Sequence, residues 1–304
     1  MKLSLVIPCF NEAPCIRPFY SAVTALSLPC ELEFIFIDDG STDNTLAELK
    51  SLSVTHTEVH FISFSRNFGK EAALLAGLRK SSGMYTVTLD ADLQHPVSLL
   101  SEMLTYLTSG EFDCVAARRI TREKGTRIRN CFARCFYFLL HKISKLETLQ
   151  GETDYRMMTH QVVSSILTLP EVNRFTKGIY AWVGFKTKWL TFENVERVHG
   201  KTKWSFFKLL QYSIEGLSAF STIPLQISSL LGVVCFSSAI LYSIYVIFKT
   251  IIIGEVVQGY PTLVCLILFL GGVQLFTIGI LGNYLAKTYL ETKRRPMYLI
   301  KEEK

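Results

Sequence analysis

Two long runs without a charged residue constrain this chain more than any other feature. The first, 225–248, has 24 residues, the second, 262–286, has 25, and the whole segment 224–286 contains only Lys249 and Glu255 as charged side chains. A helix needs about 20 apolar residues to cross the hydrocarbon core of a bilayer. Two helices buried in a soluble core are the alternative, but such helices are commonly shorter, at about 10–14 residues. The runs therefore predict a transmembrane hairpin of two helices.

Outside this hairpin the chain has the charge content of a water-soluble protein. The 304 residues include 32 Lys and Arg and 26 Asp and Glu, and only two of these charged side chains lie within the hairpin. This size and composition exclude a disulfide-rich miniprotein, a fibre and a disordered chain. We expect a soluble domain at 1–205, a juxtamembrane interfacial helix at 206–223, the hairpin at 224–286 and a basic tail at 287–304.

The distribution of basic residues predicts the orientation of the hairpin. Four of them closely follow the second helix: Lys287, Lys293, Arg294 and Arg295. Lys and Arg accumulate on the cytoplasmic side of membranes, so the soluble domain and both termini are expected in the cytoplasm. The eight cysteines are scattered without a CxxC pair, which favours reduced thiols in that compartment. The basic residues are concentrated near the membrane segment, which favours anionic lipid over nucleic acid as a partner.

The soluble domain alternates short apolar runs with segments that suit helices. This alternation predicts βαβ units and a sheet that is mainly parallel, with helices on both faces. In each unit a polar or acidic cluster follows the carboxyl end of the strand, where open α/β sheets bind their ligands. The expected strands are 3–7, 34–37, 59–64 and 85–89, and the expected helices include 13–28 and 71–80.

Two acidic clusters follow expected strands. The cluster 38–43, DDGSTD, suits a turn with a helix cap as well as a ligand site, so both interpretations stay open. The cluster 90–94, DADLQ, places two carboxylates one residue apart and an amide two residues farther on. Such oxygen ligands suit Mg²⁺ or Mn²⁺, which take their remaining ligands from phosphates and water. We therefore expect a metal and nucleotide-diphosphate site, followed by a helix that starts at His95 and Pro96.

Four motifs taken together resemble the family 2 glycosyltransferases, which have the GT-A fold. They are VIPCFNE at 6–12, IDDGSTD at 37–43, SRNFGK at 65–70 and DADLQHP at 90–96. Within the family the chain is most similar to polyprenyl-phosphate glycosyltransferases, which include dolichol-phosphate mannose synthases and bactoprenol glucosyltransferases. The resemblance extends over nearly the whole chain. It implies an α/β GT-A domain, Rossmann-like with a mixed and mainly parallel sheet, followed by a two-helix transmembrane hairpin.

The resemblance assigns roles to single residues on the donor side. Asp90, Asp92 and Gln94 match the metal-binding DxDxQ motif, with Mg²⁺ or Mn²⁺ as the implied cofactor. Arg118 is an alternative to Arg119 for the arginine near the phosphates. The nucleotide-sugar donor is expected to contact Pro8, Phe10, Glu12, Asp39, Asp90, Ala91, Arg119, Arg197 and Lys203.

The resemblance also implies an acceptor side. Asp154 begins a segment, DYRMM, that is similar to the family's GDFRLM, although Thr153 stands where glycine is usual. Asp92 and Asp154 are the expected catalytic residues, and the alternatives for Asp154 are a cap and a salt bridge to Arg156. The acceptor phosphate is expected to contact Arg127, Arg129 and Arg156.

The activity that the resemblance implies is an inverting transfer of a hexose, with glucose favoured, from a UDP-sugar to undecaprenyl phosphate. The product would serve the modification of cell-surface glycans such as O-antigen and lipopolysaccharide. Alternatives are the same reaction with galactose, N-acetylglucosamine or GDP-mannose, and a non-catalytic membrane protein that handles a lipid carrier. A polymer synthase fits less well because the chain has no QxxRW sequence. The resemblance further implies a bacterial inner-membrane protein with the bilayer as a partner, and a homo-oligomer, with a tetramer as one option.

Overall fold

The computed structural model divides the chain into two units. One unit comprises Met1–Ser213 together with Arg295–Lys304, and the other comprises Ile214–Arg294. The expected boundary between a soluble domain and a C-terminal tail therefore differs from the observed one, because the last ten residues belong to the first unit. The structure describes residues 1–120, 152–193, 223–253 and 259–304.

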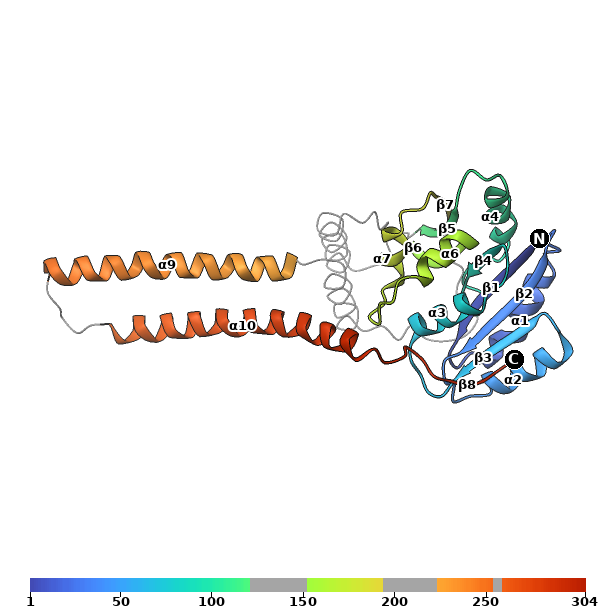
Figure 1. Cartoon of the computed structure of the whole chain (residues 1–304), viewed down its shortest axis with the longest axis horizontal. Coiled ribbons are helices and arrows are strands. Elements are labelled where there is room, and N and C mark those ends of the chain that lie inside the picture. Colours follow the sequence, from blue (N-terminus) through green and yellow to red (C-terminus); the bar gives the residue numbers. More distant parts are fainter. Residues whose placement is uncertain (121–151, 194–222, 254–258) are drawn as a thin grey trace. The chain divides into compact units, whose positions relative to one another are not determined.

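A mixed sheet forms the centre of the first unit (Figure 1). The order of its strands is β7-β5-β6-β4-β1-β2-β3-β8. Strands β4, β1, β2 and β3 run parallel to one another, as the alternation of strands and helices predicts, whereas β6 and β8 run antiparallel to their neighbours β4 and β3. The strands are β1 (Lys2–Cys9), β2 (Glu31–Asp38), β3 (Val59–Phe64), β4 (Tyr85–Thr88), β5 (Cys114–Ile120), β6 (Glu152–Thr159), β7 (Thr187–Glu193) and β8 (Ile300–Glu303).

Helices cover both faces of this sheet because successive side chains of a strand point to opposite faces. Leu3, Leu5 and Ile7 of β1 pack with α1, α2 and α4 on one face, and Val6 packs with α3 on the other. Helix α6 contacts α3 and lies on the same side. The helices of this unit are α1 (Ala13–Thr24), α2 (Thr45–Thr55), α3 (Lys70–Lys80), α4 (Leu99–Thr108), α6 (His160–Leu167) and α7 (Thr176–Trp182).

Two expected boundaries near the sheet's carboxyl edge differ from the structure. Strand β1 continues through Pro8 to Cys9, beside β2, although an end at Pro8 was expected. Proline has no N–H, and β4 pairs with β1 only as far as Val6, so no strand on that side needs this donor. The helix expected from His95 begins later, at Leu99, after a turn in which Leu93 has a φ of 56°.

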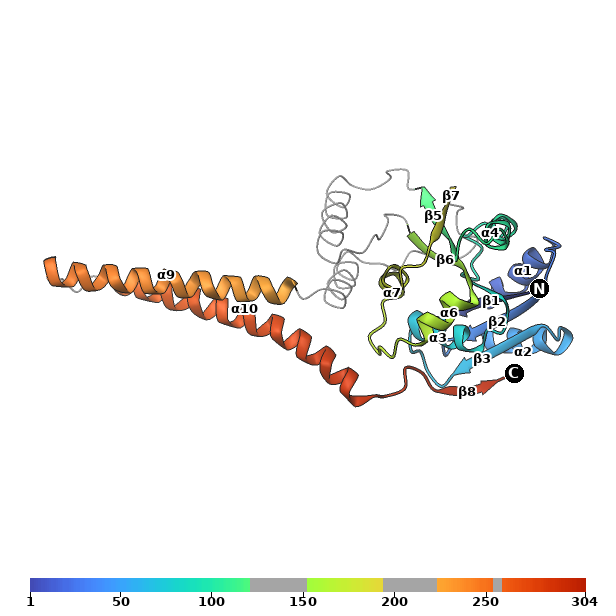
Figure 2. The same cartoon turned by 45° about the horizontal axis from the view of Figure 1, so that its top comes forward.

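The end of the chain forms an edge strand rather than a simple tail. Strand β8 pairs antiparallel with β3, so that Ile62 lies opposite Glu303 (Figure 2). Just before β8, the ring of Tyr298 stacks on Phe64 with 4.9 Å between the ring centroids. Residues 287–293, expected in the tail, are the last turns of a long helix. The basic composition of 287–304 predicted only a tail, whereas its last residues form a strand that covers the edge of the sheet.

The second unit contains two long helices, α9 (Ile223–Ile253) and α10 (Tyr260–Lys293), which lie side by side (Figures 1 and 2). They are longer than the expected spans at 225–248 and 262–286. Among the described residues, one stretch is long and apolar enough to cross a membrane, namely Phe269–Lys293 within α10. In α9 the comparable apolar stretch, Ser228–Tyr242, is shorter. By length and composition, the structure therefore supports membrane association through α10.

Candidate active site

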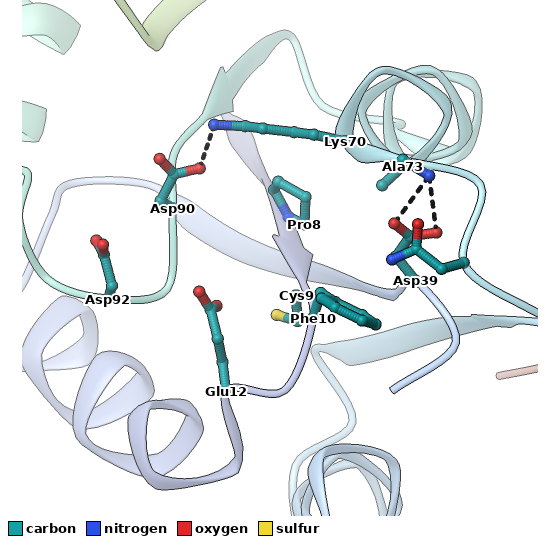
Figure 3. Close-up of a pocket in the computed structure, with 11 residues that line it drawn as sticks. Pro8, Cys9, Phe10, Glu12, Asp39, Lys70, Ala73, Asp90 and Asp92 are labelled. Carbon is teal, nitrogen blue, oxygen red and sulfur yellow. Dashed lines mark hydrogen bonds and ion pairs between the residues drawn. The ribbon is translucent and has the colours of Figure 1, made fainter. Parts of the chain in front are cut away.

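A pocket opens at the carboxyl-terminal edge of the parallel strands (Figure 3). Its volume is about 320 Å³. The residues that line it come from the ends of β1, β2 and β4, from the loop after β3 and from the start of α3: Pro8, Cys9, Phe10, Glu12, Asp39, Asn67, Gly69, Lys70, Ala73, Asp90 and Asp92. Six of the predicted site residues therefore meet in one pocket, where open α/β sheets bind their ligands.

Lys70, the first residue of α3, connects two of the acidic positions. Its ammonium lies 2.6 Å from Asp90 Oδ1 and 2.8 Å from Asp154 Oδ2 (the Asp90 contact is drawn in Figure 3). Burial disfavours the charge of Lys70, but the two carboxylates outweigh it and raise the pKa of Lys70. Burial also acts against the charge of Asp154, but Lys70 outweighs it, so the pKa of Asp154 is lowered. Asp154 thus forms its ion pair with Lys70, and not with Arg156 as the alternative interpretation had it.

Three carboxylates face the acidic end of the pocket. Asp90, Asp92 and Glu12 point toward the same space in Figure 3. Asp92 Oδ1 accepts a hydrogen bond from the backbone N–H of Gln94 at 3.1 Å. Among the described residues, no three His, Cys, Asp or Glu side chains form a complete metal site. Mg²⁺ needs only one or two protein carboxylates when substrate phosphates supply other ligands, so the Asp90 and Asp92 oxygens fit a cation that is shared with a diphosphate.

For the acidic cluster after β2, the sequence left open a structural role in a turn and a role in a ligand site, and the structure contains one residue of each kind. Asp38 is buried and has a structural role, because Oδ1 accepts from the Ser41 N–H at 3.0 Å and Oδ2 from the Ser63 hydroxyl at 2.8 Å. Asp39 lines the pocket and accepts the backbone N–H groups of Phe68 and Gly69, at 2.7 Å and 3.0 Å (the Gly69 bonds are drawn in Figure 3). Burial raises the pKa of Asp39, and these hydrogen bonds oppose the effect.

The loops after β2 and β3 approach each other at the other end of the pocket. Gly40 has a φ of +65°, and a Cβ there would lie 2.7 Å from the backbone nitrogen of Asn67. Only glycine combines this backbone conformation with so close an approach. Phe10, which lies beside Asp39 in Figure 3, is 44% exposed and offers its ring as a flat apolar surface. This end therefore offers an aromatic ring and polar groups, whereas the other end offers carboxylates.

Comparisons with known proteins identify the family. Residues 4–166 match the family described as glycosyl transferase family 2. The chain is 42% identical over 306 residues to the prophage bactoprenol glucosyl transferase homolog of Escherichia coli K12, and the match covers 100% of both chains. It is also 42% identical to the bactoprenol glucosyl transferase of Shigella phage SfV, over 100% of this chain and 99% of the relative. The chain belongs to glycosyl transferase family 2. It is an enzyme, a glycosyltransferase.

Among solved structures, the glucosyl-3-phosphoglycerate synthase of Mycobacterium tuberculosis, in complex with Mn²⁺, UDP-glucose and phosphoglyceric acid, resembles this glycosyltransferase. The TM-score is 0.48 at 21% identity, and the match covers 72% of this chain and 78% of that one. The family assignment rests on the sequence matches over the whole chain.

Burial distinguishes two of the predicted site residues of this glycosyltransferase. Ala91 has its side chain fully buried in the hydrophobic core between the pocket-lining Asp90 and Asp92, and its place beside the nucleotide stays a prediction. Arg156 was expected at the acceptor phosphate, but it is 3% exposed and pairs with Glu152 at 2.5 Å. Its guanidinium also lies 4.2 Å from the ring centroid of Tyr180. Arg156 is therefore removed from the candidate acceptor site, because a buried and paired guanidinium does not reach a phosphate.

Arg119 and Arg118 are neighbours on β5 and so face opposite sides of the sheet. The Nε of Arg119 is buried and has no hydrogen-bond partner among the described residues. Arg119 also acts on His95, whose pKa is lowered by burial first and further by Lys70 and Arg119, against Asp90 and Asp92. This favours Arg119 over Arg118 as the arginine near the acidic cluster. The predicted residues Arg127, Arg129, Arg197 and Lys203 lie outside the described residues, as does the predicted interfacial helix at 206–223 except for its last residue, Ile223, which begins α9.

Three charged residues of the site were not predicted: Lys70, Glu71 and Lys177. Lys70 ended a quoted motif but received no role, although a lysine that follows a Gly-containing loop at the sheet's carboxyl edge was a usable signal. Glu71 and Lys177 carried no signal in the sequence, because the contact between α3 and α7 joins residues 105 positions apart.

Proposed function

We propose that this glycosyltransferase moves a hexose, namely glucose, from UDP-glucose to undecaprenyl phosphate and so forms a polyprenyl phosphate-sugar for a cell-surface glycan. The observation that carries this proposal is the combined pocket of Asp90, Asp92 and the Lys70–Asp154 pair, in a chain whose full-length relatives are named bactoprenol glucosyl transferases. UDP-galactose, UDP-N-acetylglucosamine and GDP-mannose are the alternative donors. Membership in an enzyme family argues against a non-catalytic role.

The chemistry of the two ends of the pocket supports binding of the donor's base at one end and of its diphosphate at the other. Phe10 offers a face on which a base can stack, and Asp39 and Asn67 offer polar groups beside it. The diphosphate would then lie toward Asp90 and Asp92, which would hold Mg²⁺ or Mn²⁺ together with Gln94. Such a cation supplies positive charge at the departing diphosphate. Among the described residues, Arg119 acts on His95 together with Asp90 and Asp92, and it is a cation of the chain itself that fits the same role.

The reaction needs positioning more than proton removal. An oxygen of the acceptor phosphate forms a bond to the anomeric carbon while the bond from that carbon to the diphosphate breaks, and the diphosphate leaves with the electron pair. A single displacement of this kind inverts the configuration. A phosphate oxygen is already ionised at neutral pH. Because Lys70 lowers the pKa of Asp154 against the effect of burial, Asp154 is a weak base, which suits a role in orienting the acceptor or the sugar.

The membrane part of the proposal gives the acceptor its place. An isoprenoid chain stays in the bilayer, so the enzyme has to hold its pocket near the lipid headgroups. Large apolar side chains are exposed on both long helices, among them Leu241 at 69% and Leu275 at 72%. The pairing of β8 with β3 supports two spans, because an odd number of crossings would separate these strands by the membrane. Basic residues at the end of α10 support a cytoplasmic pocket at the inner membrane of a bacterium.

The variant Asp92→Asn tests the proposal. The assay measures the transfer of labelled glucose from UDP-glucose to undecaprenyl phosphate in purified protein with Mg²⁺ or Mn²⁺. We expect a loss of at least about 100-fold in kcat, the scale seen when a group that stabilises developing charge is removed. Glu111→Gln is the matched control, because Glu111 forms a surface ion pair with Lys186 and is 64% exposed at its side chain. Unchanged transfer in Asp92→Asn, or an α-linked product from the α-linked donor, would contradict the mechanism.

A further inference from the structure

The start of helix α7 is fastened to helix α3 by a buried carboxylate. Glu71 accepts a hydrogen bond from the backbone N–H of Thr176 at 3.2 Å and another from the Thr176 hydroxyl. Thr176 is buried and opens α7. Glu71 follows Lys70 directly, so the fastening lies next to the ion pair between Lys70 and Asp154. The position of the residues that follow Thr176 is thereby tied to the acceptor side of the pocket.

Lys177 follows Thr176 directly, so the hydrogen bonds between Glu71 and Thr176 fix the backbone next to Lys177. Its ammonium donates a hydrogen bond to the carbonyl oxygen of Glu152 at 3.0 Å, and Glu152 lies two residues before Asp154 on β6. Within the described part of the chain, no carboxylate lies within ion-pair distance of Lys177. Its side chain is half-buried, so one face remains open to solvent.

Among the described residues, the other cations near Asp154 are already engaged. Lys70 lies between two carboxylates, and Arg156 is buried against Glu152 and Tyr180. Lys177 acts on Asp154 as well: against burial, which comes first, it joins Lys70 in lowering the pKa of that carboxyl. Lys177 thus lies close enough to lower the pKa of Asp154, and its hydrogen-bond acceptor in the described part of the chain is a neutral carbonyl oxygen.

We propose that Lys177 binds the phosphate of the prenyl phosphate acceptor, and that Glu71 is a positioning residue that holds Lys177 in place through Thr176. This inference rests on the proposed function and adds a binding residue to its acceptor side. A phosphomonoester carries a charge of about −1.5 to −2 at neutral pH. The carboxylate of Asp154 repels it and Lys70 is shared between two carboxylates, so a second cation beside Asp154 favours binding of the phosphate. An ammonium that exchanges one carbonyl oxygen for a phosphate oxygen gains a charge-assisted hydrogen bond.

The test separates the acceptor from the donor. Steady-state rates are measured with a short-chain polyprenyl phosphate in detergent while each substrate is varied in turn, for the variants Lys177→Met and Lys177→Arg. We expect Lys177→Met to raise the acceptor KM by about tenfold or more and to leave the donor KM within about twofold, because a charged hydrogen bond to phosphate is lost. Lys177→Arg should restore most of the acceptor KM. Lys186→Met, which removes an exposed lysine whose ion pair is with Glu111 at the surface, serves as the control.

Glu71 is tested in the same assay. Glu71→Ala should raise the acceptor KM more than the donor KM, and Glu71→Gln, which can still accept the Thr176 hydrogen bonds, should stay closer to the parent protein. Thermal unfolding in detergent shows whether each variant is folded. A Lys177→Met variant with an unchanged acceptor KM, or with equal losses for donor and acceptor, would overturn the inference.

Direct binding distinguishes this failure from a failure of the proposed function. The probes are geranyl phosphate and the neutral alcohol geraniol. If the parent protein binds the phosphate through Lys177 but transfers no glucose to polyprenyl phosphate, the proposed function is wrong and the phosphate site stands. If Lys177→Met binds geranyl phosphate as the parent protein does, the phosphate site is wrong, whatever the transfer assay gives.

Discussion

At the scale of residues, carboxylates outnumber cationic side chains among the described residues in and beside the pocket. Lys70 pairs with both Asp90 and Asp154, and Asp154 lies close enough to Glu71 to affect its ionisation. Like charges in one buried region disfavour ionisation, and burial adds to that effect. Glu71 has no cation in direct contact among the described residues and is bound to Thr176. As a result, burial first, and then Asp154, raise the pKa of Glu71 from 4.5 to about 7.

This raised pKa predicts a stability that falls as the pH rises. Between pH 4.5 and about 7 the folded protein keeps a proton on Glu71 that the unfolded chain has lost, so this group lowers the free energy of unfolding as pH increases through that window. The effect is on the order of 1–3 kcal/mol, at about 1.4 kcal/mol for each unit of pKa. Glu71→Gln has no proton to lose, so its advantage over the parent protein should grow from pH 5 to pH 8.

The measurement is thermal unfolding in detergent at a series of pH values, with Glu111→Gln as the control at an exposed carboxyl. Glu111→Gln should run parallel to the parent protein across the whole range. If the Glu71→Gln curve also runs parallel, Glu71 titrates at its ordinary pKa and the buried position carries no such effect.

At the scale of elements, the close approach of the loops after β2 and β3 depends on Gly40. Gly110, which follows α4, provides a comparison. Both glycines have a left-handed backbone, with φ of +65° and +72°, but their surroundings differ. A Cβ at Gly40 would meet the backbone of Arg66 and Asn67, whereas nothing lies within 4 Å of a Cβ at Gly110. The pair therefore separates backbone strain from steric contact.

We expect Gly110→Ala to lower the free energy of unfolding by about 1–2 kcal/mol, the strain of a left-handed residue with a side chain. Gly40→Ala should lower it further and should also weaken the binding of UDP, because the loops it forces apart carry Asp39 and Asn67. Thermal unfolding and calorimetric titration with UDP and Mn²⁺ measure the two effects. Equal losses in the two variants, with unchanged binding of UDP, would show that the loops do not depend on this close approach.

The elements also show what the sequence could and could not predict. Strand β3 has the predicted bounds, because an apolar run that ends in a polar loop is a local signal. Strand β8 was not predicted, since its partner lies some 240 residues earlier and its own sequence, IKEE, is polar. The role of Arg156 was also mistaken, because its burial comes from Tyr180 and Trp189, which reach it from α7 and β7. Local patterns predicted the parallel sheet and the acidic edge, whereas the contacts between distant segments required the structure.

At the scale of the whole molecule, the chain leaves its first unit before α9 and returns to it after α10. Residues Arg295–Lys304 belong to the same unit as β1 to β7, and Lys304 donates its backbone N–H to Phe61 at 3.0 Å. Ion pairs also hold the last residues against this unit, since Lys50 pairs with Glu302 at 2.6 Å and Lys80 with Glu303 at 3.1 Å. A chain that crosses a membrane between two paired strands has to cross it an even number of times. The proposed crossing of α10 therefore requires a second one, and among the described helices α9 can supply it.

We therefore expect the link between the two helices to lie on the far side of the membrane from both ends of the hairpin. In a bacterial host, green fluorescent protein fused after Lys304 should fluoresce, and alkaline phosphatase fused at the same point should be inactive. The same reporters fused after Gly259, before α10, should give the opposite result, because the chain has then crossed once. A fusion after Ser213, before α9, serves as the control and should match the fusion after Lys304. If the Gly259 fusions behave like the Lys304 fusions, neither helix crosses, since the pairing of β3 with β8 allows no single crossing. The exposed apolar side chains of α9 and α10 would then have to lie in the plane of the membrane surface or against another protein.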